Sequence, residues 1–587
     1  MRTTKSAVIG AVCAALALSF AACSSPSNNN TTTTSSTATS TTSTTASSSS
    51  SSAGGDQGYM GGSIVTHGCT PQNPLIGGMT QEVCGGYILD TVSAQLVRYD
   101  SVTADPIMDV AESITPNSDS TVFTVKLNKG YMYSDGTEVK AQDFVNAWNY
   151  EAYMPNGFAQ APFLAPVKGF DDLQCGTVND AAGRPQAACD TQPPKATKMS
   201  GLAVQDDYTF TITTSAPTSN LVVRLGYPAY QPLPASFFVA GSDPLKAADI
   251  DTYGKMPVTA GPYYVTGNTA TDITLEKNPH YSGKVPGHVD KIDYRIYNDL
   301  AAAYADLVAN NLDYIDSIPT DQMVGDQWIN TLGKDRTSQV AGPTIQALDF
   351  SPADPQLKDV KLRQAISMAI DRPTVTKNIF NGARVPMTGW VPPFINGYKE
   401  GQCGDACTYN PDAAKALYAQ TAGYKGTMQL SVNGDGGHKD WADAVCISIK
   451  NVLGIDCQTN VTPDFKTLLD QAEKGQLNGM FRAGWAMDYP SIEDYLTPIY
   501  KTGADSNYTN YSNKAFDQKL VDAAAAPTVD QANALYQEAE KMLATDLPSI
   551  PMWYYNLSTA WSNRVTNVVT TPFGYADLSA IQVLPGK

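Results

Sequence analysis

Alternation of hydrophobic and polar residues marks the first clear element of the chain. Within Thr121–Leu127, apolar and polar residues alternate from Phe123 to Leu127. Phe123, Val125 and Leu127 would therefore face a core, as in a strand buried on one side. A helical pattern follows at about 141–152.

Strands and helices then alternate along the rest of the sequence. The pattern predicts a hairpin at 261–278, a strand at 290–298, a helix at 300–310, a helix at 360–370, a strand at 427–434, a helix, turn and strand within 439–461, and a helix followed by a strand within 530–555. The residues predicted to face inward from two of these helices are Leu362, Ala365, Ile366, Ala369 and Ile370 in the first, and Leu535, Ala539, Met542 and Leu543 in the second. Such alternation places the chain in the α/β class.

Residues 1–22 are predicted to be an export signal. A short basic region precedes the apolar run Ala7–Phe20, which is too short to span a bilayer as a stable helix. Small residues before Cys23 form a lipobox pattern, in which Cys23 would carry a lipid, although Phe20 stands where leucine is usual. The alternative is ordinary cleavage followed by secretion.

Residues 23–58 are predicted to form a lipid-anchored linker. Thr31–Ser52 is nearly pure serine and threonine. Such a segment buries too little to offset the entropy of ordering, so it would behave as a flexible tether. A glycosylated stalk would have the same mechanical role.

Length and charge narrow the class of protein. A chain of 587 residues is too long for one hydrophobic core, so at least two lobes are expected. The formal net charge is −18. Nucleic acid is therefore not an expected partner, because its phosphates require a basic surface.

Eight cysteines follow Cys13 and Cys23. They fall into four neighbouring pairs, which indicates four local disulfides in an exported protein, with the connectivity left open. These residues are Cys69, Cys84, Cys175, Cys189, Cys403, Cys407, Cys446 and Cys457. A metal site is a weak competitor, since no CxxC occurs and the four histidines do not have zinc-ligand spacing. No metal or other cofactor is expected.

Four segments together resemble one known family. They are Val110–Trp148 ("VAESITPNSDSTVFTVKLNKGYMYSDGTEVKAQDFVNAW"), Met256–Gly283, Val360–Pro386 and Cys407–Tyr424. In order and spacing they are similar to the solute-binding proteins of peptide and nickel ABC importers, family 5, of the oligopeptide-binding type. The resemblance covers essentially everything after Gly62.

The resemblance implies a periplasmic-binding-protein-like fold with two lobes, two interlobe crossovers and a ligand enclosed between the lobes. Lobe one would comprise 63–340, with an extra subdomain at about 97–216. Lobe two would comprise 341–555, and 556–587 would return to lobe one. Lobes of this kind close around a ligand by hinge motion.

The segment "RAGWAMDYPS", Arg482–Ser491, resembles the one that lies along the bound peptide in oligopeptide-binding members. The resemblance implies that Asp488 receives the peptide ammonium. The backbone of Gly484, Trp485 and Ala486 would pair with the peptide as an added strand. Arg482 would receive the peptide carboxylate, for one ligand length only. In the structural alternative Asp488 caps a turn, Arg482 forms an ion pair and Trp485 belongs to the core.

Other aromatic residues are candidates for side-chain pockets. They are Trp390, Phe394 and the run Trp553–Tyr555. Core and loop packing is the simpler interpretation of each of them.

The signal and tether predict anchoring to the outer face of the cell membrane, and the resemblance implies a monomeric binding protein that delivers peptides to ABC permease subunits. Rival solutes within the family are a nickel chelate, haem or an oligosaccharide. A surface adhesin is a further alternative. An enzyme is not expected, because GxSxG, HExxH and GxGxxG are all absent from the sequence.

Overall fold

The computed structural model describes residues 59–586 apart from 81–82, 180–184, 244, 298, 435–436, 464 and 505. The predicted export signal, the lipidation site Cys23 and the linker up to residue 58 lie outside the described residues. None of the described helices combines the length and the apolar character needed to cross a bilayer.

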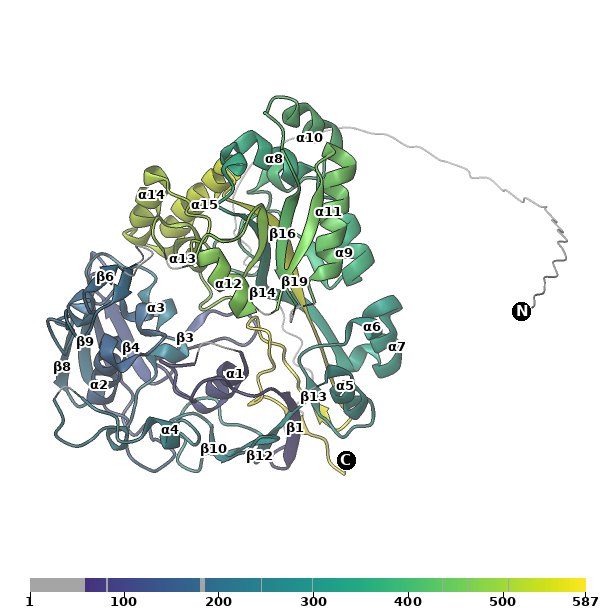
Figure 1. Cartoon of the computed structure of the whole chain (residues 1–587). Coiled ribbons are helices and arrows are strands. Elements are labelled where there is room, and N and C mark those ends of the chain that lie inside the picture. The colour runs from purple at the N-terminus through teal and green to yellow at the C-terminus, as the bar shows by residue number, and fades with distance from the viewer. Residues whose placement is uncertain are drawn as a thin grey trace, which may run out of the picture. The chain divides into compact units, whose positions relative to one another are not determined.

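One large mixed sheet runs through the described part of the chain. In spatial order its strands are β10 (Tyr263–Asn268), β11 (Asp272–Lys277), β12 (Lys291–Ile296), β1 (Ser63–Gly68), β13 (Tyr314–Ile315), β19 (Ser549–Trp561), β14 (Thr337–Phe350), β18 (Met480–Trp485), β16 (Met428–Asn433) and β17 (Cys457–Thr462), and β15 (Arg384–Pro386) pairs with β19. Strands β10 to β13 belong to lobe one, and strands β16 to β18 belong to lobe two (Figure 1).

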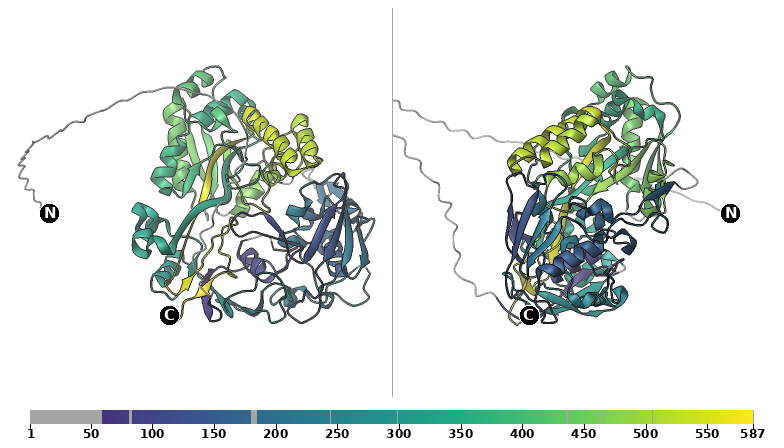
Figure 2. Two further views of the ribbon diagram at one scale, coloured as in Figure 1. Left: turned by 180° about the vertical axis from the view of Figure 1, so that it is seen from behind. Right: turned by 90° about the vertical axis from the view of Figure 1, so that its left-hand side faces the viewer.

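Two long strands connect the lobes. Strands β14 and β19 pair antiparallel from Thr337 opposite Ala560 to Asp349 opposite Ser549. The rear view in Figure 2 shows this pair running from lobe two into lobe one. The sheet therefore continues from one lobe to the other through these two crossovers, as the predicted fold class requires.

A second sheet forms a subdomain within lobe one. Its strand order is β4 (Ala111–Pro116), β5 (Val122–Leu127), β9 (Thr209–Thr213) and β8 (Leu202–Asp206), and α2 (Ala141–Ala152) packs against it. The inward residues of β5 are buried as its alternation predicts. Trp148 of α2 meets Phe210 of β9 at 5.8 Å between ring centroids, which places the helix on the sheet.

Helices cover both faces of the lobe-two sheet. Phe380 of α9 (Arg372–Phe380) and Trp441 of α11 (Lys439–Leu453) each lie 5.1 Å from Trp553 on one face. Helices α13 (Thr497–Tyr500) and α15 (Val529–Asp546) lie across the sheet from them (Figure 1).

The predicted inward stripe of α8 (Val360–Met368), which continues into Ala369 and Ile370, is fully buried. The stripe predicted for α15 is only partly right. Ala539 and Leu543 are buried, whereas Leu535 and Met542 lie half-buried at the edge of the core. Tyr536 and Glu540 occupy the inward face beside them.

The remaining elements are short or lie at the edges of the lobes. The helices are α1 (Val83–Val92), α3 (Leu221–Arg224), α4 (Ile250–Tyr253), α5 (Leu300–Val308), α6 (Thr320–Met323), α7 (Gln327–Leu332), α10 (Pro411–Tyr418), α12 (Phe465–Glu473) and α14 (Lys514–Ala524). The strands are β2 (Val97–Tyr99), β3 (Pro106–Met108), β6 (Thr177–Asn179), β7 (Pro185–Ala187), β20 (Val565–Thr566) and β21 (Gln582–Val583).

Disulfides join the four neighbouring cysteine pairs: Cys69–Cys84, Cys175–Cys189, Cys403–Cys407 and Cys446–Cys457. Each bridge closes a short loop and therefore stabilises local structure.

Candidate functional site

Strand β18 has different neighbours at its two ends. Strand β14 pairs with it along its whole length, from Met480 opposite Phe350 to Trp485 opposite Ile345. Strand β16 pairs with it only at Met480 and Phe481. Among the described strands, none therefore lies along the outer edge of Gly484 and Trp485. A strand edge of this kind is a template for pairing with another extended backbone.

The turn after β18 is fixed by a buried carboxylate. Asp494 is 1% exposed, and its Oδ2 accepts hydrogen bonds from Trp485 Nε1 at 3.1 Å and from the Asp488 backbone N at 3.0 Å. Burial, followed by the negative charge of Asp488, raises the pKa of Asp494 well above its usual value. Trp485 is thus oriented by its indole nitrogen, while Gly484 and Ala486 are exposed.

The side chain of Asp488 is half-buried and faces lobe one. Burial raises the pKa of Asp488 to about 7, and the positive charge of Arg224 and a hydrogen bond with Tyr227 act in the opposite direction. Because burial disfavours the ionised carboxylate, a cation placed beside it would be bound favourably.

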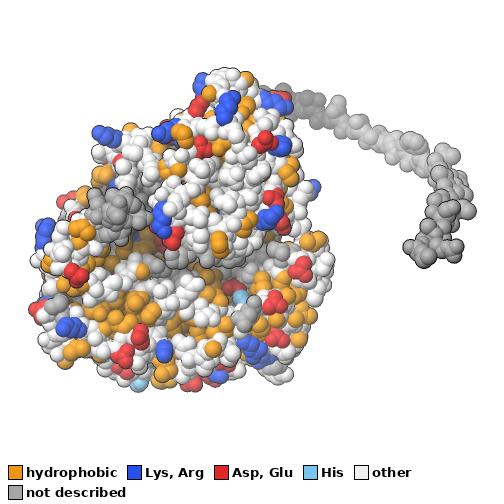
Figure 3. Space-filling view, viewed as in Figure 1, with side chains coloured by type: hydrophobic (Ala, Val, Ile, Leu, Met, Phe, Trp, Pro, Cys, Tyr) orange, Lys and Arg blue, Asp and Glu red, His pale blue; other side chains and the backbone are white. Residues whose placement is uncertain are grey.

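The two lobes meet directly next to Asp488. Asn220 Nδ2 of lobe one donates a hydrogen bond to Glu493 Oε2 of lobe two at 3.0 Å, and the Tyr489 hydroxyl donates to the same oxygen. The Arg224 guanidinium lies 4.9 Å from the centroid of the Tyr489 ring. Figure 3 shows a hollow between the two lobes, with hydrophobic side chains gathered along its lower side.

Arg482 lies on the same face of the sheet as Gly484. A Cβ added at Gly484 would stand 3.2 Å from Arg482 Nη2 and 3.1 Å from the Ile345 carbonyl oxygen. The absence of a side chain at residue 484 therefore leaves room for the Arg482 guanidinium. The ligand contacts predicted for Arg482, Gly484, Trp485, Ala486 and Asp488 stay predictions.

The other aromatic candidates divide between core and cleft. Trp390 and Trp553 are fully buried, and Tyr554 is 3% exposed, so packing accounts for them. Phe394 lines a small cavity between the lobes together with Asn220. Tyr555 is half-buried on the crossover strand β19.

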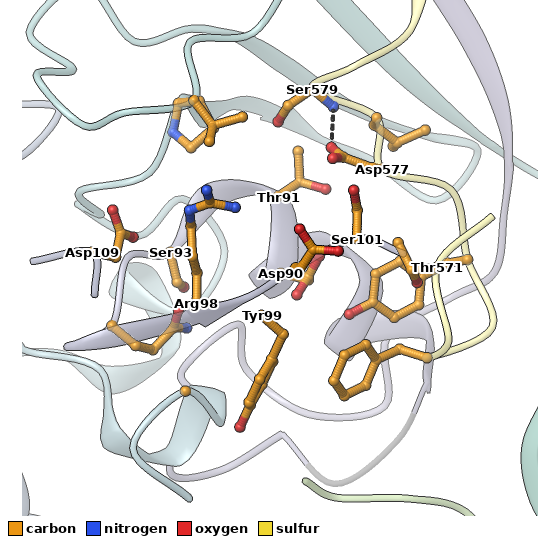
Figure 4. Close-up of a pocket in the computed structure, with 18 of the residues that line it drawn as sticks. Asp90, Thr91, Ser93, Arg98, Tyr99, Ser101, Asp109, Thr571, Asp577 and Ser579 are labelled. Atoms are coloured by element: carbon orange, nitrogen blue, oxygen red, sulfur yellow. Dashed lines mark hydrogen bonds between the residues drawn. The ribbon is translucent and has the colours of Figure 1, made fainter. Parts of the chain in front are cut away.

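A polar cavity of about 110 Å³ lies within lobe one and was missed by the sequence reasoning. Figure 4 shows Asp90, Arg98, Asp109 and Asp577 around it. Burial raises the pKa values of Asp90 and Asp109 to about 6. Its lining combines α1 and β2 with the distant tail near Thr571, so no local pattern reveals it. None of the predicted site residues lines this cavity.

Comparison with known proteins identifies the family. Residues 105–507 match the model described as "Bacterial extracellular solute-binding proteins, family 5 Middle". The chain is 26% identical to the periplasmic oligopeptide-binding protein OppA of Escherichia coli (strain K12), over 77% of this chain and 79% of that protein. It is 25% identical to the oligopeptide-binding protein OppA of Bacillus subtilis (strain 168), over 82% of this chain and 87% of that protein.

A solved structure shares the fold. The crystal structure of Haemophilus influenzae OppA in complex with the peptide RPPGFSPFR superposes with a TM-score of 0.70, at 20% identity, over 90% of this chain and all of that one. The two-lobed α/β fold and the matched segment agree with the resemblance seen in the sequence. The chain belongs to family 5 of the bacterial extracellular solute-binding proteins.

Proposed function

We propose that the protein captures peptides between its two lobes and delivers them to an ABC permease. The observation that carries this proposal is the outer edge of β18 at Gly484 and Trp485, which has no described strand along it and ends beside the Asp488 carboxylate. A peptide has the matching chemistry, since it carries an ammonium group next to an extended backbone.

The two contacts have separate tasks. The Asp488 carboxylate would receive the ammonium, which would be costly to bury without a partner. The backbone of Gly484, Trp485 and Ala486 would pair with the peptide main chain, and such bonds do not depend on the ligand side chains. Peptides of many sequences would therefore bind.

The relatives support this class of solute. The names of the two matched proteins describe oligopeptide binding, and the matched crystal structure holds a peptide. The two OppA relatives and the protein in the matched crystal structure are all named as binding proteins or hold a peptide, so a binding role rather than an enzymatic one is proposed here too.

Each segment of the chain would have its own task. Residues 1–22 would direct export, Cys23 would carry the lipid, and residues 23–58 would tether the binding unit to the outer face of the cell membrane. Within that unit we assign 63–340 and 556–587 to lobe one and 341–555 to lobe two. The unit would act as a monomer that presents the loaded cleft to the permease.

Thermal unfolding tests the proposal. The chain from residue 23 onward, with Cys23→Ala for solubility, is heated with peptides of two to eight residues, each free and N-acetylated. Free peptides should raise the midpoint, by about 2.7 kcal/mol of stability at a hundredfold excess over Kd. Acetylation or Asp488→Ala should abolish the ligand-induced shift. A sugar, haem or a metal chelate that shifts the midpoint where no peptide does would overturn the assignment.

A further inference from the structure

A contact between the lobes places Arg224 next to the segment that carries Asp488. Arg224 ends helix α3 of lobe one, and its guanidinium lies 4.9 Å from the centroid of the Tyr489 ring of lobe two. The Tyr489 ring also lies 6.4 Å from the ring of Phe163 in lobe one. Since Tyr489 follows Asp488 directly in the sequence, the guanidinium is held over the turn that contains the predicted ammonium receptor.

Hydrogen bonds fix the residues just before α3 on lobe two. The Ser219 backbone N donates to the Ala524 carbonyl oxygen at 3.1 Å, and Asn220 Nδ2 donates to Glu493 Oε2 at 3.0 Å. Neither bond involves the side chain of Arg224. The position of α3 against lobe two therefore does not depend on the charge of Arg224 alone.

The charge of Arg224 is not used in an ion pair among the described residues. Its side chain is half-buried, its Nε is buried without a hydrogen-bond acceptor, and no described carboxylate lies within ion-pair distance. Burial acts to lower the pKa of Arg224, but the neighbouring Tyr489 and Glu493 raise it, and it lies above its usual value. The guanidinium therefore stays charged and acts on the surrounding carboxylates through space.

The carboxylates around Arg224 leave one negative charge for a ligand. Asp488, Glu493 and Asp494 lie within seven residues of the chain. Burial, followed by the charge of Asp488, raises the pKa of Asp494 well above its usual value, so Asp494 is the group that holds a proton. Arg224 then balances one of the other two carboxylates. An ammonium group of the ligand would balance the second.

The groups that act on Asp488 come from both lobes. Burial favours its neutral form, whereas the charge of Arg224 and a hydrogen bond with Tyr227, both of lobe one, favour the carboxylate. On its own segment of lobe two, Asp488 interacts electrostatically with Asp494 and Tyr495. Lobe one therefore supplies groups that favour the charged receptor, while its surroundings in lobe two oppose that charge.

We propose that the ammonium receptor is shared between the lobes, and that Arg224 is its positioning residue, whose charge stabilises the Asp488 carboxylate from across the cleft. This inference rests on the proposed function. It adds to the predicted receptor a residue that acts through Asp488 and does not itself touch the ligand.

Titration calorimetry tests the inference by counting the protons released when a peptide binds. The Cys23→Ala chain from residue 23 onward is titrated at pH 7.5 with free alanine peptides of two to six residues, in two buffers of different ionisation enthalpy. An ammonium bound at Asp488 expels the proton from every molecule in which Asp488 is protonated. With the pKa of Asp488 at about 7, that is about a quarter of the wild-type chains.

Arg224→Met removes the charge and keeps an apolar stem against Tyr489. Without a nearby opposite charge the pKa of Asp488 should rise by about one pH unit or more. Proton release at pH 7.5 should therefore increase by about half a proton per peptide. Proton uptake by the peptide amine is the same for every variant, so it cancels in the comparison.

Three variants separate the charge of Arg224 from its packing. Arg224→Lys restores the charge and should release as few protons as wild type. Asn220→Ala removes an interlobe hydrogen bond without changing charge, and should weaken binding with proton release unchanged. Arg224→Gln lacks the charge but keeps hydrogen-bond donors, and carries the expectation for Arg224→Met if that variant does not fold.

Arg363→Met is the matched control. Arg363 is also half-buried, stacks on an aromatic ring, Phe350, at 5.6 Å, and has a buried Nε without an acceptor, but it lies near the opposite end of β18. Its replacement should leave proton release unchanged.

The outcomes distinguish the two proposals. If peptides bind and the uncharged Arg224 variants release no more protons than wild type, or if Arg363→Met gives the same increase, Arg224 does not act on Asp488 and this inference fails alone. If no peptide binds the wild-type chain, the proposed function fails and the inference falls with it.

Discussion

The two ends of strand β18 have the same backbone conformation but different surroundings. Met480 and Phe481 are at most 1% exposed and have a strand on each side. Gly484 is exposed, and of the described strands only β14 accompanies it. Met480 and Phe481 therefore hold the sheet of lobe two together. At Gly484 the outer edge of the backbone has no described strand beside it and could pair with a ligand. Under the proposed function, the point where β16 stops pairing is what allows one end of β18 to bind a ligand.

The largest expected effect is at the structural end. Phe481→Ala should lower the free energy of unfolding by about 3–5 kcal/mol, because it opens a cavity against Leu468 and Leu477. Denaturant unfolding measures this loss. The peptide affinity of the folded fraction should stay within about twofold of wild type, so a large change in affinity would show that the two ends are not separable.

Asp488→Asn should give the largest effect at the binding end. Free peptides should lose about 2–5 kcal/mol of binding free energy, because the ammonium is left buried without a counter-charge. Titration calorimetry measures the loss, and Asp456→Asn, at an exposed surface carboxylate, is the control. Unchanged affinity would remove Asp488 from the site.

Peptide binding should depend on pH near neutrality. Since burial raises the pKa of Asp488 to about 7, protonation competes with the ammonium below that pH. Affinity should fall about tenfold for each pH unit below 7, and fall again above about 8 as the peptide amine loses its proton. Calorimetry at pH 5.5, 6.5 and 7.5 measures this slope, which should be absent in Asp488→Asn.

The same raised pKa affects the stability of the unliganded protein. Between the ordinary aspartate pKa of about 4 and the folded value of about 7, the folded state binds more protons, so this group lowers stability as pH rises. Asp488→Asn should therefore raise the unfolding midpoint at pH 8 and leave it nearly unchanged at pH 4. Equal shifts at both pH values would contradict this linkage.

The smallest expected effect concerns the turn that follows β18 and links Trp485 to Asp494. Trp485→Phe removes the indole donor to Asp494 and should cost about 1 kcal/mol of stability. The Asp488 backbone N–H would still hold Asp494. A double-mutant cycle with Asp494→Asn checks the contact, and strictly additive losses would show that it contributes nothing.

Local periodicity was sufficient to predict much of the fold. The alternation of β5 and the stripe of α8 depend on neighbouring residues only, and both are confirmed. The inward face of α15 was partly missed because Glu540 is polar, yet its Oε1 accepts a hydrogen bond from the Trp390 backbone N at 2.7 Å. A buried hydrogen bond of this kind has no periodic signature.

The site was predictable only as far as one contiguous segment carries it. The resemblance of Arg482–Ser491 predicted ligand contacts for Asp488 and the adjoining backbone, and these contacts stay predictions. Asp494 was not identified as the acceptor of the turn. Asp494 lies only six residues after Asp488, and an acceptor in an irregular turn of this kind has no periodic signature in the sequence.

Amide hydrogen exchange along β18 tests the central claim most directly. Exchange is measured on the Cys23→Ala chain from residue 23 onward, with and without a saturating free tetrapeptide. If the ligand backbone pairs with the open edge, exchange should slow within Gly484–Ala486 and stay unchanged at Met480 and Phe481, which are already protected by strands on both sides. Bound peptide with unaltered exchange throughout Gly484–Ala486 would contradict the account.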